Sequence, residues 1–361
     1  MTTAPASAPD RSAAPLRMLA AALAACCIAL GIMASPVAAA PAQAEDTCGS
    51  PLRCVSLTSV SNGRQLDVQN GSRNDGAYVV TNSAPGHHQA WNLAVDPADS
   101  SFNIVNGTTG KCIDLGWPAL RQQTCRGQKS QKWYFQPVAG STTAFMIRNE
   151  SDNSCLDLVG NAQYDDAWTG QSRCHAGTNQ RWSTNSTAAF NLAVDHGARA
   201  CQKDPANCSW AVRAEAPAAP LPKVCASSVW YNNSGSPVTQ SFSVNRTTGW
   251  QSSIGTTLSS DLSAGIAPAL QTRVATSLSF QNVWSGSTSV GDGIQVSVPA
   301  GQYGWVTLSV LAKKVTGNWT FDARGFPWQA DDTITVPVKD DPTGGATVYI
   351  ANTSPTFTSC A

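Results

Sequence analysis

The chain has 361 residues, with 23 basic and 23 acidic side chains and a formal net charge of zero. Proteins that bind nucleic acid usually carry an excess of basic residues, so this balance argues against a nucleic-acid partner. Charged residues make up only 13% of the chain, whereas roughly 25% is usual in soluble domains. Few charges, 12 Trp residues and many small polar residues are typical of β proteins, so we expect an all-β fold. The length favours two domains.

Residues 1–44 have the three-part pattern of a secretory signal peptide. Arg17 precedes an apolar run over residues 18–33, and Ala42-Gln43-Ala44 forms a small-residue cleavage site. The apolar run is too short to predict a transmembrane span. We therefore expect cleavage near Ala44 and a secreted, extracellular protein. Residues 23–26 resemble a lipobox, which leaves a lipid-anchored protein as the alternative.

Ten cysteines follow the expected cleavage site. An even number of cysteines in an exported protein predicts a set of disulfides. None of them is in a CxxC arrangement, and most of the four His residues are scattered along the chain. We therefore expect neither a metal site nor a cofactor.

The tripeptide Gln-x-Trp occurs three times in the first half of the chain, with its Trp residues 42 and 49 positions apart. Upstream of each tripeptide lies a triplet in which an Asp stands between two apolar residues. One such unit cannot bury its own apolar face, but three units around a pseudo-threefold axis can. The three Trp residues are Trp91, Trp133 and Trp182, and the three Asp residues are Asp67, Asp114 and Asp157.

Cysteines recur with the second and third repeats. In both, one Cys directly precedes the Asp triplet and another lies eight residues before the Trp, whereas the first repeat lacks both. Because the two cysteines are present or absent together, we expect the disulfides Cys112–Cys125 and Cys155–Cys174. The other six allow many pairings, and we favour Cys48–Cys54, Cys201–Cys208 and Cys225–Cys360.

With these repeats, residues 45–184 resemble the ricin-type lectins, the Q-x-W β-trefoil family. The resemblance implies that the triplet Asp accepts hydrogen bonds from two adjacent sugar hydroxyls. It also implies a further polar contact from the residue before the Gln, and a ring two residues before the second Cys that stacks on the sugar. No repeat has the full set, because Thr81, Gln123 and Ser172 occupy the ring positions.

The third repeat retains most of the implied sugar site, so we expect carbohydrate to bind there. Trp168 can supply the missing ring from an adjacent position, as can Tyr164, and Trp117 can do so in the second repeat. A trefoil that binds no sugar is the alternative, with these residues serving only as turn and core contacts. The candidate residues are Asp157, Asn179, Gln180 and Trp168 in repeat three, Asp67, His88 and Gln89 in repeat one, and Asp114 and Gln131 in repeat two.

Residues 185–224 separate this region from the second half of the chain. They contain Cys201 and Cys208 and end in an Ala/Pro-rich stretch over residues 216–222. Pro-rich sequence disfavours helix and favours an extended spacer. We therefore expect a disulfide-bearing connector between two domains.

Apolar and polar residues alternate through much of residues 225–361. Between about residues 256 and 282 the alternation continues for longer than one ordinary strand, with Gly265 and Pro268 as a possible turn. Two strands of this length, apolar on one face and polar on the other, are typical of a transmembrane β-hairpin. An amphipathic hairpin lying on a soluble sheet is the alternative.

Residues 225–361 also resemble the aerolysin-like β-pore-forming toxins. The resemblance rests on residues 230–235, on 247–250, on the polar hairpin and on 298–302 before the next strand. It implies an elongated antiparallel β-domain that self-associates on a target membrane and inserts the hairpin as part of a homo-oligomeric pore. The trefoil would then dock the protein on glycans. The alternative is a secreted lectin, or an accessory carbohydrate-binding protein, that forms no pores.

An enzyme is not expected. A glycosidase usually needs two carboxylates that flank the scissile bond, and the second half offers only Glu215 and scattered Asp residues. A Ser-His-Asp triad would need His196, around which no nucleophile motif occurs.

Overall fold

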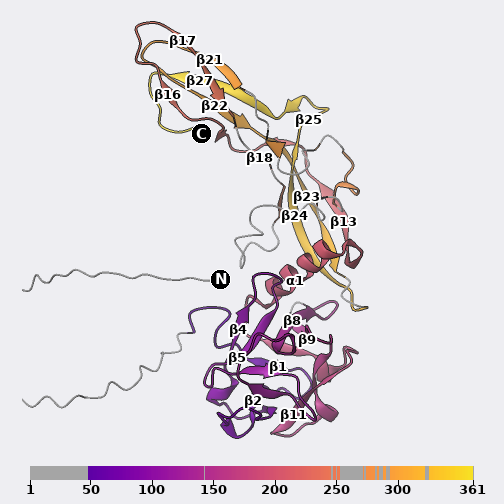
Figure 1. The fold of residues 1–361 in the computed structure, drawn as a ribbon. Helices are drawn as coiled ribbons and strands as arrows, with labels where there is room; N and C mark the ends of the chain where they lie inside the picture. The colour runs from indigo at the N-terminus through magenta and orange to yellow at the C-terminus, as the bar shows by residue number, and fades with distance from the viewer. Residues whose placement is uncertain are drawn as a thin grey trace, which may run out of the picture. The chain divides into compact units, whose positions relative to one another are not determined.

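The computed structural model describes residues 48–141, 143–244, 247–248, 250–252, 271, 274–280, 283, 288–289, 293–321 and 325–360. These residues are nearly all β, with one longer helix, α1 (Ala189–Lys203), which confirms the expected fold class (Figure 1). The expected signal peptide lies outside the described residues. No helix in the described part is long and apolar enough to cross a membrane.

Twelve short strands form the N-terminal β-trefoil, four in each repeat. The chain closes on itself where the first strand pairs with the last, with Leu57 opposite Thr184. The strands are β1 (Leu57–Ser59), β2 (Gln65–Val68), β3 (Val79–Asn82), β4 (Trp91–Val95), β5 (Phe102–Asn106), β6 (Cys112–Asp114), β7 (Arg121–Gln123), β8 (Lys132–Pro137), β9 (Ala144–Asn149), β10 (Cys155–Leu158), β11 (Ala167–Ser172) and β12 (Trp182–Thr184).

The three Gln-x-Trp tryptophans form the centre of the trefoil core. Trp91, Trp133 and Trp182 are each at most 1% exposed. A buried indole N–H needs an acceptor, and each one donates to the backbone oxygen of the residue just before the repeat's Asp, at 3.0, 3.2 and 3.1 Å. The repeated sequence pattern therefore corresponds to the same hydrogen bond in each repeat, from the core indole to the backbone of the Asp triplet.

The C-terminal part consists of antiparallel sheets (Figure 1). The longest strands, β23 (Leu311–Phe321) and β24 (Trp328–Val338), pair along all eleven residues of each. Around them lie β13 (Cys208–Glu215), β14 (Ala219–Pro220) and β19 (Gln251–Ser252), and a second sheet contains β15 (Val224–Cys225), β16 (Trp230–Tyr231), β22 (Tyr303–Ser309) and β27 (Val348–Ser354). Three two-stranded ribbons pair β17 (Val238–Ser243) with β21 (Gly293–Val298), β18 (Thr247–Thr248) with β20 (Thr288–Ser289), and β25 (Asp340–Asp341) with β26 (Gly345–Ala346).

Residues 185–224, the expected disulfide-bearing connector, contain a helix and two strands, and their Ala/Pro-rich stretch is not helical. α1 buries Ala189, Leu192 and Ala193, and apolar residues spaced i, i+3, i+4 form the buried stripe of an amphipathic helix. After the helix, β13 and β14 pair with β23. The segment is ordered because it packs on both of its neighbours in the chain.

Most of the hairpin expected between about residues 256 and 282 lies outside the described residues. Where that segment is described, Gln271, Val274 and Ala275 are helical, and Ser277 N donates to Val274 O at 2.9 Å in a turn. Val274 is fully buried in the main core. The expected strand is therefore wrong at these residues, because burial of Val274 in a helical turn replaces sheet pairing.

The ten cysteines of the described part form five disulfides with the expected pairings, and the paired Cα atoms are 5.1–5.5 Å apart. The bonds are Cys48–Cys54, Cys112–Cys125, Cys155–Cys174, Cys201–Cys208 and Cys225–Cys360.

Candidate functional site

The Gln of each Gln-x-Trp tripeptide holds the Asp of its own repeat. The Gln Nε2 donates to Asp Oδ2 at 3.0 Å in repeat one, 3.0 Å in repeat two and 2.8 Å in repeat three. It also donates to a loop carbonyl, while Gln Oε1 accepts from a loop backbone N–H. These side chains are Gln89, Gln131 and Gln180, and each positions a carboxylate while its own polar atoms are satisfied.

In repeat three, the carboxylate of Asp157 keeps one oxygen for a ligand. Its Oδ2 accepts from Gln180 and from Asn179 Nδ2 at 3.0 Å, and His175 Nε2 lies 3.8 Å away. None of the described side chains or backbone N–H groups donates to Oδ1. The Asp157 side chain is 9% exposed. Burial raises the pKa of Asp157, although the hydrogen bonds from Gln180 and Asn179 oppose the shift.

In repeat one, the protein itself occupies both carboxylate oxygens of Asp67. Val68 N donates to Oδ1 at 2.6 Å, and Asn82 Nδ2 joins Gln89 at Oδ2, at 3.2 Å. The strand partner opposite Asp67 is Val80, which is fully buried. Each oxygen of Asp67 therefore already accepts from a protein group, unlike Oδ1 of Asp157.

Repeat two differs at the position across the strand pair. Asp114 lies opposite Arg121, whereas the residue opposite Asp157 in repeat three is Gly170. A side chain at Gly170 would place Cβ 3.1 Å from Val159 Cγ2, so glycine lets Val159 pack beside the site. Only in repeat three do a free carboxylate oxygen and a small residue opposite the Asp occur together.

A ring lies on the same face of the sheet as Asp157. Trp168 is two positions from Gly170 along β11, so its side chain projects to the same side as those of Gly170 and Asp157. It is 40% exposed, and its ring centroid is 5.2 Å from that of Tyr78 in repeat one. Trp168 is therefore an exposed ring on the face of the sheet that carries Asp157.

Three other candidates, His88, Tyr164 and Trp117, have different surroundings. His88 lies close to the backbone at Gly71, where a Cβ would be 2.7 Å from its Nε2, so its ring packs on a turn of its own repeat. Tyr164 and Trp117 are 65% and 84% exposed.

The sequence did not identify four residues of these sites. Asn82 and His175 contact the carboxylates of Asp67 and Asp157, and Tyr78 and Arg121 lie beside Trp168 and opposite Asp114. The strand register could have revealed three of them, since Arg121 lies opposite Asp114, and Tyr78 and Asn82 lie two positions before and after Val80, the residue opposite Asp67. His175 lies in a loop, outside any strand.

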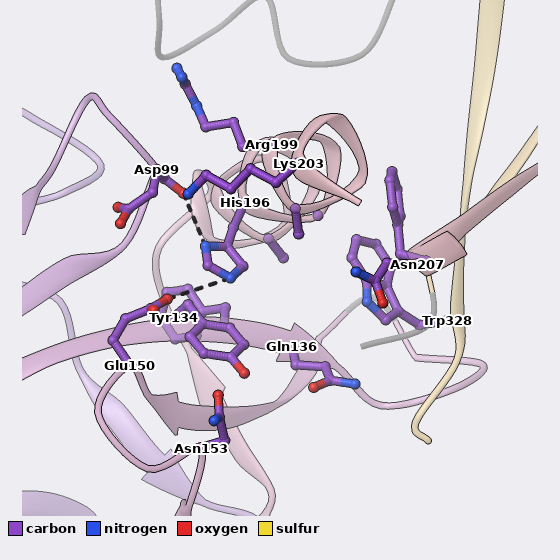
Figure 2. Close-up of a pocket in the computed structure, with 15 residues that line it drawn as sticks. Asp99, Tyr134, Gln136, Glu150, Asn153, His196, Arg199, Lys203, Asn207 and Trp328 are labelled. Atoms are coloured by element: carbon purple, nitrogen blue, oxygen red, sulfur yellow. Dashed lines mark hydrogen bonds and ion pairs between the residues drawn. The ribbon is translucent and has the colours of Figure 1, made fainter. Parts of the chain in front are cut away.

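A separate cavity of about 200 Å³ lies between α1 and the trefoil and contains none of the predicted sugar residues. Figure 2 shows His196 at its centre, where Nδ1 lies 3.0 Å from Asp99 O and Nε2 lies 3.6 Å from Glu150 Oε1. The imidazole also stacks on Tyr134, with ring centroids 4.2 Å apart. His196 therefore anchors α1 on the trefoil. The described residues contain no group of three or more side chains that could hold a metal ion.

Residues 53–182 match the family model of the ricin-type beta-trefoil lectin domain. These repeats therefore form a lectin domain of the ricin B type, a class of carbohydrate-binding module. A search of curated proteins finds no match to the chain.

Three solved structures are similar to the trefoil. The designed threefold-symmetric protein ThreeFoil is 27% identical, with a TM-score of 0.34 over 36% of this chain and 96% of its own. An exo-beta-1,3-galactanase from Clostridium thermocellum is 26% identical, with a TM-score of 0.34 over 37% of this chain and 30% of its own. The C-half of the earthworm R-type lectin, solved with GalNAc, is 21% identical, with a TM-score of 0.30 over 37% of this chain and 97% of its own.

Proposed function

We propose that the protein is a secreted lectin that binds glycans through the third trefoil repeat. The observation that carries this proposal is the carboxylate of Asp157, whose Oδ2 is fixed by Gln180 and Asn179 while Oδ1 has no donor among the described residues. A fixed carboxylate accepts strong, charge-assisted hydrogen bonds from hydroxyl groups. Because the protein has already ordered it, little entropy is lost on binding.

Trp168 completes the proposed site. Its exposed indole offers an apolar face to one side of a sugar, while Asp157 accepts hydrogen bonds from the hydroxyls. Asn179 and His175 are the other polar groups within reach of the same carboxylate. The proposed ligand is therefore a sugar with two adjacent hydroxyls beside an apolar ring face.

A glycan array tests this proposal with the mature protein and two alanine variants. We expect Asp157→Ala to abolish glycan binding and Asp67→Ala to retain it, because both oxygens of Asp67 accept from the protein whereas Oδ1 of Asp157 has no donor among the described residues. Circular dichroism checks that both variants are folded. Binding by folded Asp157→Ala at the wild-type level would exclude repeat three.

The five disulfides support export, since such bonds persist in oxidising compartments. N-terminal sequencing of the protein from a culture medium should begin at Glu45. Recovery only from the cell interior with residues 1–44 attached would contradict export.

We propose as a second function that the C-terminal part forms membrane pores. Two features support this. Residues 226–330 contain only eight charged side chains, and the antiparallel pairs Thr247–Ser289 and Thr248–Thr288 hold the two flanks of the alternating segment together. Flanks held in this way suit a segment that extends as one hairpin of a closed barrel.

Dye release from glycan-bearing cell ghosts tests the second proposal. The variant Leu258→Cys/Leu278→Cys can be closed by oxidation and opened by a mild reductant. We expect the oxidised form to bind the ghosts without releasing dye, and the opened form to release it. Dye release by the oxidised form would refute the hairpin, and binding without release by wild type would leave a lectin that forms no pores.

A further inference from the structure

Four planar side chains from all three repeats make a continuous row next to the proposed sugar site. Tyr78 contacts two of the others: its ring centroid is 5.2 Å from that of Trp168, and the Arg121 guanidinium lies over its ring, 5.2 Å from the centroid. Arg121 Nη2 then donates to the backbone oxygen of Trp117 at 3.0 Å. We call Trp168, Tyr78, Arg121 and Trp117 the planar strip.

The backbone beneath the planar strip is held by hydrogen bonds between the repeats. Val79 N donates to Leu120 O at 2.9 Å, and Leu120 N donates to Thr169 O at 2.8 Å. Thr169 Oγ1 donates in turn to Val79 O at 2.8 Å, which closes a ring of three. Each member is the sequence neighbour of a strip residue, so the strip is a fixed surface.

The planar strip presents aromatic surface to solvent. Trp117 is 84% exposed and Trp168 is 40% exposed. Exposed aromatic rings are typical of a binding surface, because a ring that stays in water contributes no burial free energy to the folding of the protein. Tyr and Trp also provide a large contact area at a low cost in conformational entropy.

The strip is continuous with the site at Asp157. Trp168 belongs to both, and the loop that carries Trp117 reaches Gly170, the residue opposite Asp157, because Pro118 O is 3.9 Å from where a Cβ of Gly170 would lie. A ligand bound at Asp157 can therefore extend along the strip without leaving the surface.

The chemistry of the strip fits sugar rings in sequence. The two exposed indoles, Trp117 and Trp168, can each offer a face to the C–H side of a pyranose, and the guanidinium of Arg121 has N–H donors for hydroxyl oxygens. Arg121 forms no ion pair in the part of the chain that the structure describes. Its cross-strand neighbour Asp114 instead accepts from Gln131. One Nη2 hydrogen of Arg121 goes to Trp117 O and its Nε is buried, so the Nη1 hydrogens are the donors left for a ligand.

We infer that the planar strip binds the further sugar units of the glycan that Asp157 holds, so that the ligand class is an oligosaccharide chain of two or more units. This inference rests on the proposed function. It assigns Tyr78, Arg121 and Trp117, from two repeats that lack a complete sugar site of their own, to the extended site of repeat three.

A chain-length series tests the inference. The best-bound glycan of the array is titrated calorimetrically as its monosaccharide, disaccharide and tetrasaccharide, with wild type, Trp117→Ala, Tyr78→Ala and Asp157→Ala. We expect Trp117→Ala and Tyr78→Ala to weaken the tetrasaccharide by roughly threefold to tenfold, the range of one aromatic contact, and to leave the monosaccharide unchanged. Tyr231→Ala, which removes a ring that is 45% exposed on β16, is the matched control and should change neither.

The outcomes separate the two proposals. Equal affinity of wild type for all lengths, or an unchanged tetrasaccharide affinity in both strip variants, would overturn the strip and leave the site at Asp157. Unchanged binding of every length by Asp157→Ala would overturn the proposed function instead. Trp117 tolerates truncation because its bond to Arg121 comes from the backbone. Loss of vesicle binding in Trp117→Ala, with glycan affinity unchanged, would assign the strip to lipid and overturn the inference.

Discussion

Replacement of Asp157 by Asn separates a binding role from a structural one, because the two molecules differ by one charge and one donor. Asn can place its oxygen where Oδ2 lies and keep the hydrogen bonds from Gln180 and Asn179. Its NH₂ group then takes the position of Oδ1, where a sugar hydroxyl would donate. We therefore expect the fold to survive and the ligand to lose its acceptor.

The size of the binding loss follows from the bond that is removed. A hydrogen bond to a charged group contributes about 1.5–3 kcal/mol, so glycan affinity should fall by about tenfold to a hundredfold. Stability should not fall. Burial raises the pKa of Asp157, which means that folding disfavours its charged form at neutral pH, and Asn removes that penalty.

Asp67→Asn is the matched control. Both oxygens of Asp67 accept from protein groups, so an Asn there must turn its NH₂ toward one of these donors. A buried donor without an acceptor costs about 1–3 kcal/mol. This variant should melt several degrees lower while it binds glycan as wild type does.

Calorimetric glycan titration and thermal melts at pH 7.5 measure both effects. The reasoning is refuted if Asp157→Asn melts as low as Asp67→Asn and binds glycan normally, since Asp157 would then be another structural tie.

Three further predictions follow from charge and cross-links. Because the pKa of Asp157 is raised by burial, glycan titrations at decreasing pH should show binding fail above the ordinary value of 3.8, as the carboxylate takes up a proton; a loss that begins only below 3.8 would contradict this. Burial raises the pKa of Asp195 in α1 to about 6, so the stability of the wild type should fall as the pH rises from 3.8 through about 6. In denaturant titrations, Asp195→Asn should be more stable than wild type by at most about 3 kcal/mol at pH 8 and equally stable at pH 4. An equal gain in stability at both pH values would exclude burial of the charge as the cause. Replacing Cys155 and Cys174 by Ser should lower stability by about 2–4 kcal/mol. It should also weaken glycan binding, because Arg173 and His175, the neighbours of Cys174, hold Gln180 through their backbone O and N–H. Replacing Cys112 and Cys125 by Ser should lower stability and leave glycan binding unchanged.

The trefoil was predictable because its signals are local and recur three times. The bond from each Gln-x-Trp indole to its Asp triplet, and the paired cysteines, follow from residue types at fixed spacings. The site was predictable only in part, since the exclusion of Asp67 depends on Asn82 and on the backbone of Val68. Tyr78 and Arg121 depend on contacts between repeats, which spacing within one repeat does not encode.

The sequence did not predict α1 or the pairing of β13 with β23. The segment 189–203 contains four Ala residues, which favour helix, but also Gly197 and Asp195, which disfavour it, so its intrinsic preference is mixed. Packing against neighbouring strands decides its structure, as the burial of Leu192, Val194 and Cys201 shows. Such burial depends on residues that are distant in the chain.

The disulfide between Cys225 and Cys360 has a consequence for proteolysis. It joins residues that are 135 positions apart, so the chain between them is a covalent loop. A single cut within that loop yields two fragments that stay linked until the bond is reduced, and β27 keeps its covalent connection to the remainder of the chain as well as its pairing with β22. A protein nicked once in this region should therefore run as one band on a non-reducing gel and as two under reduction.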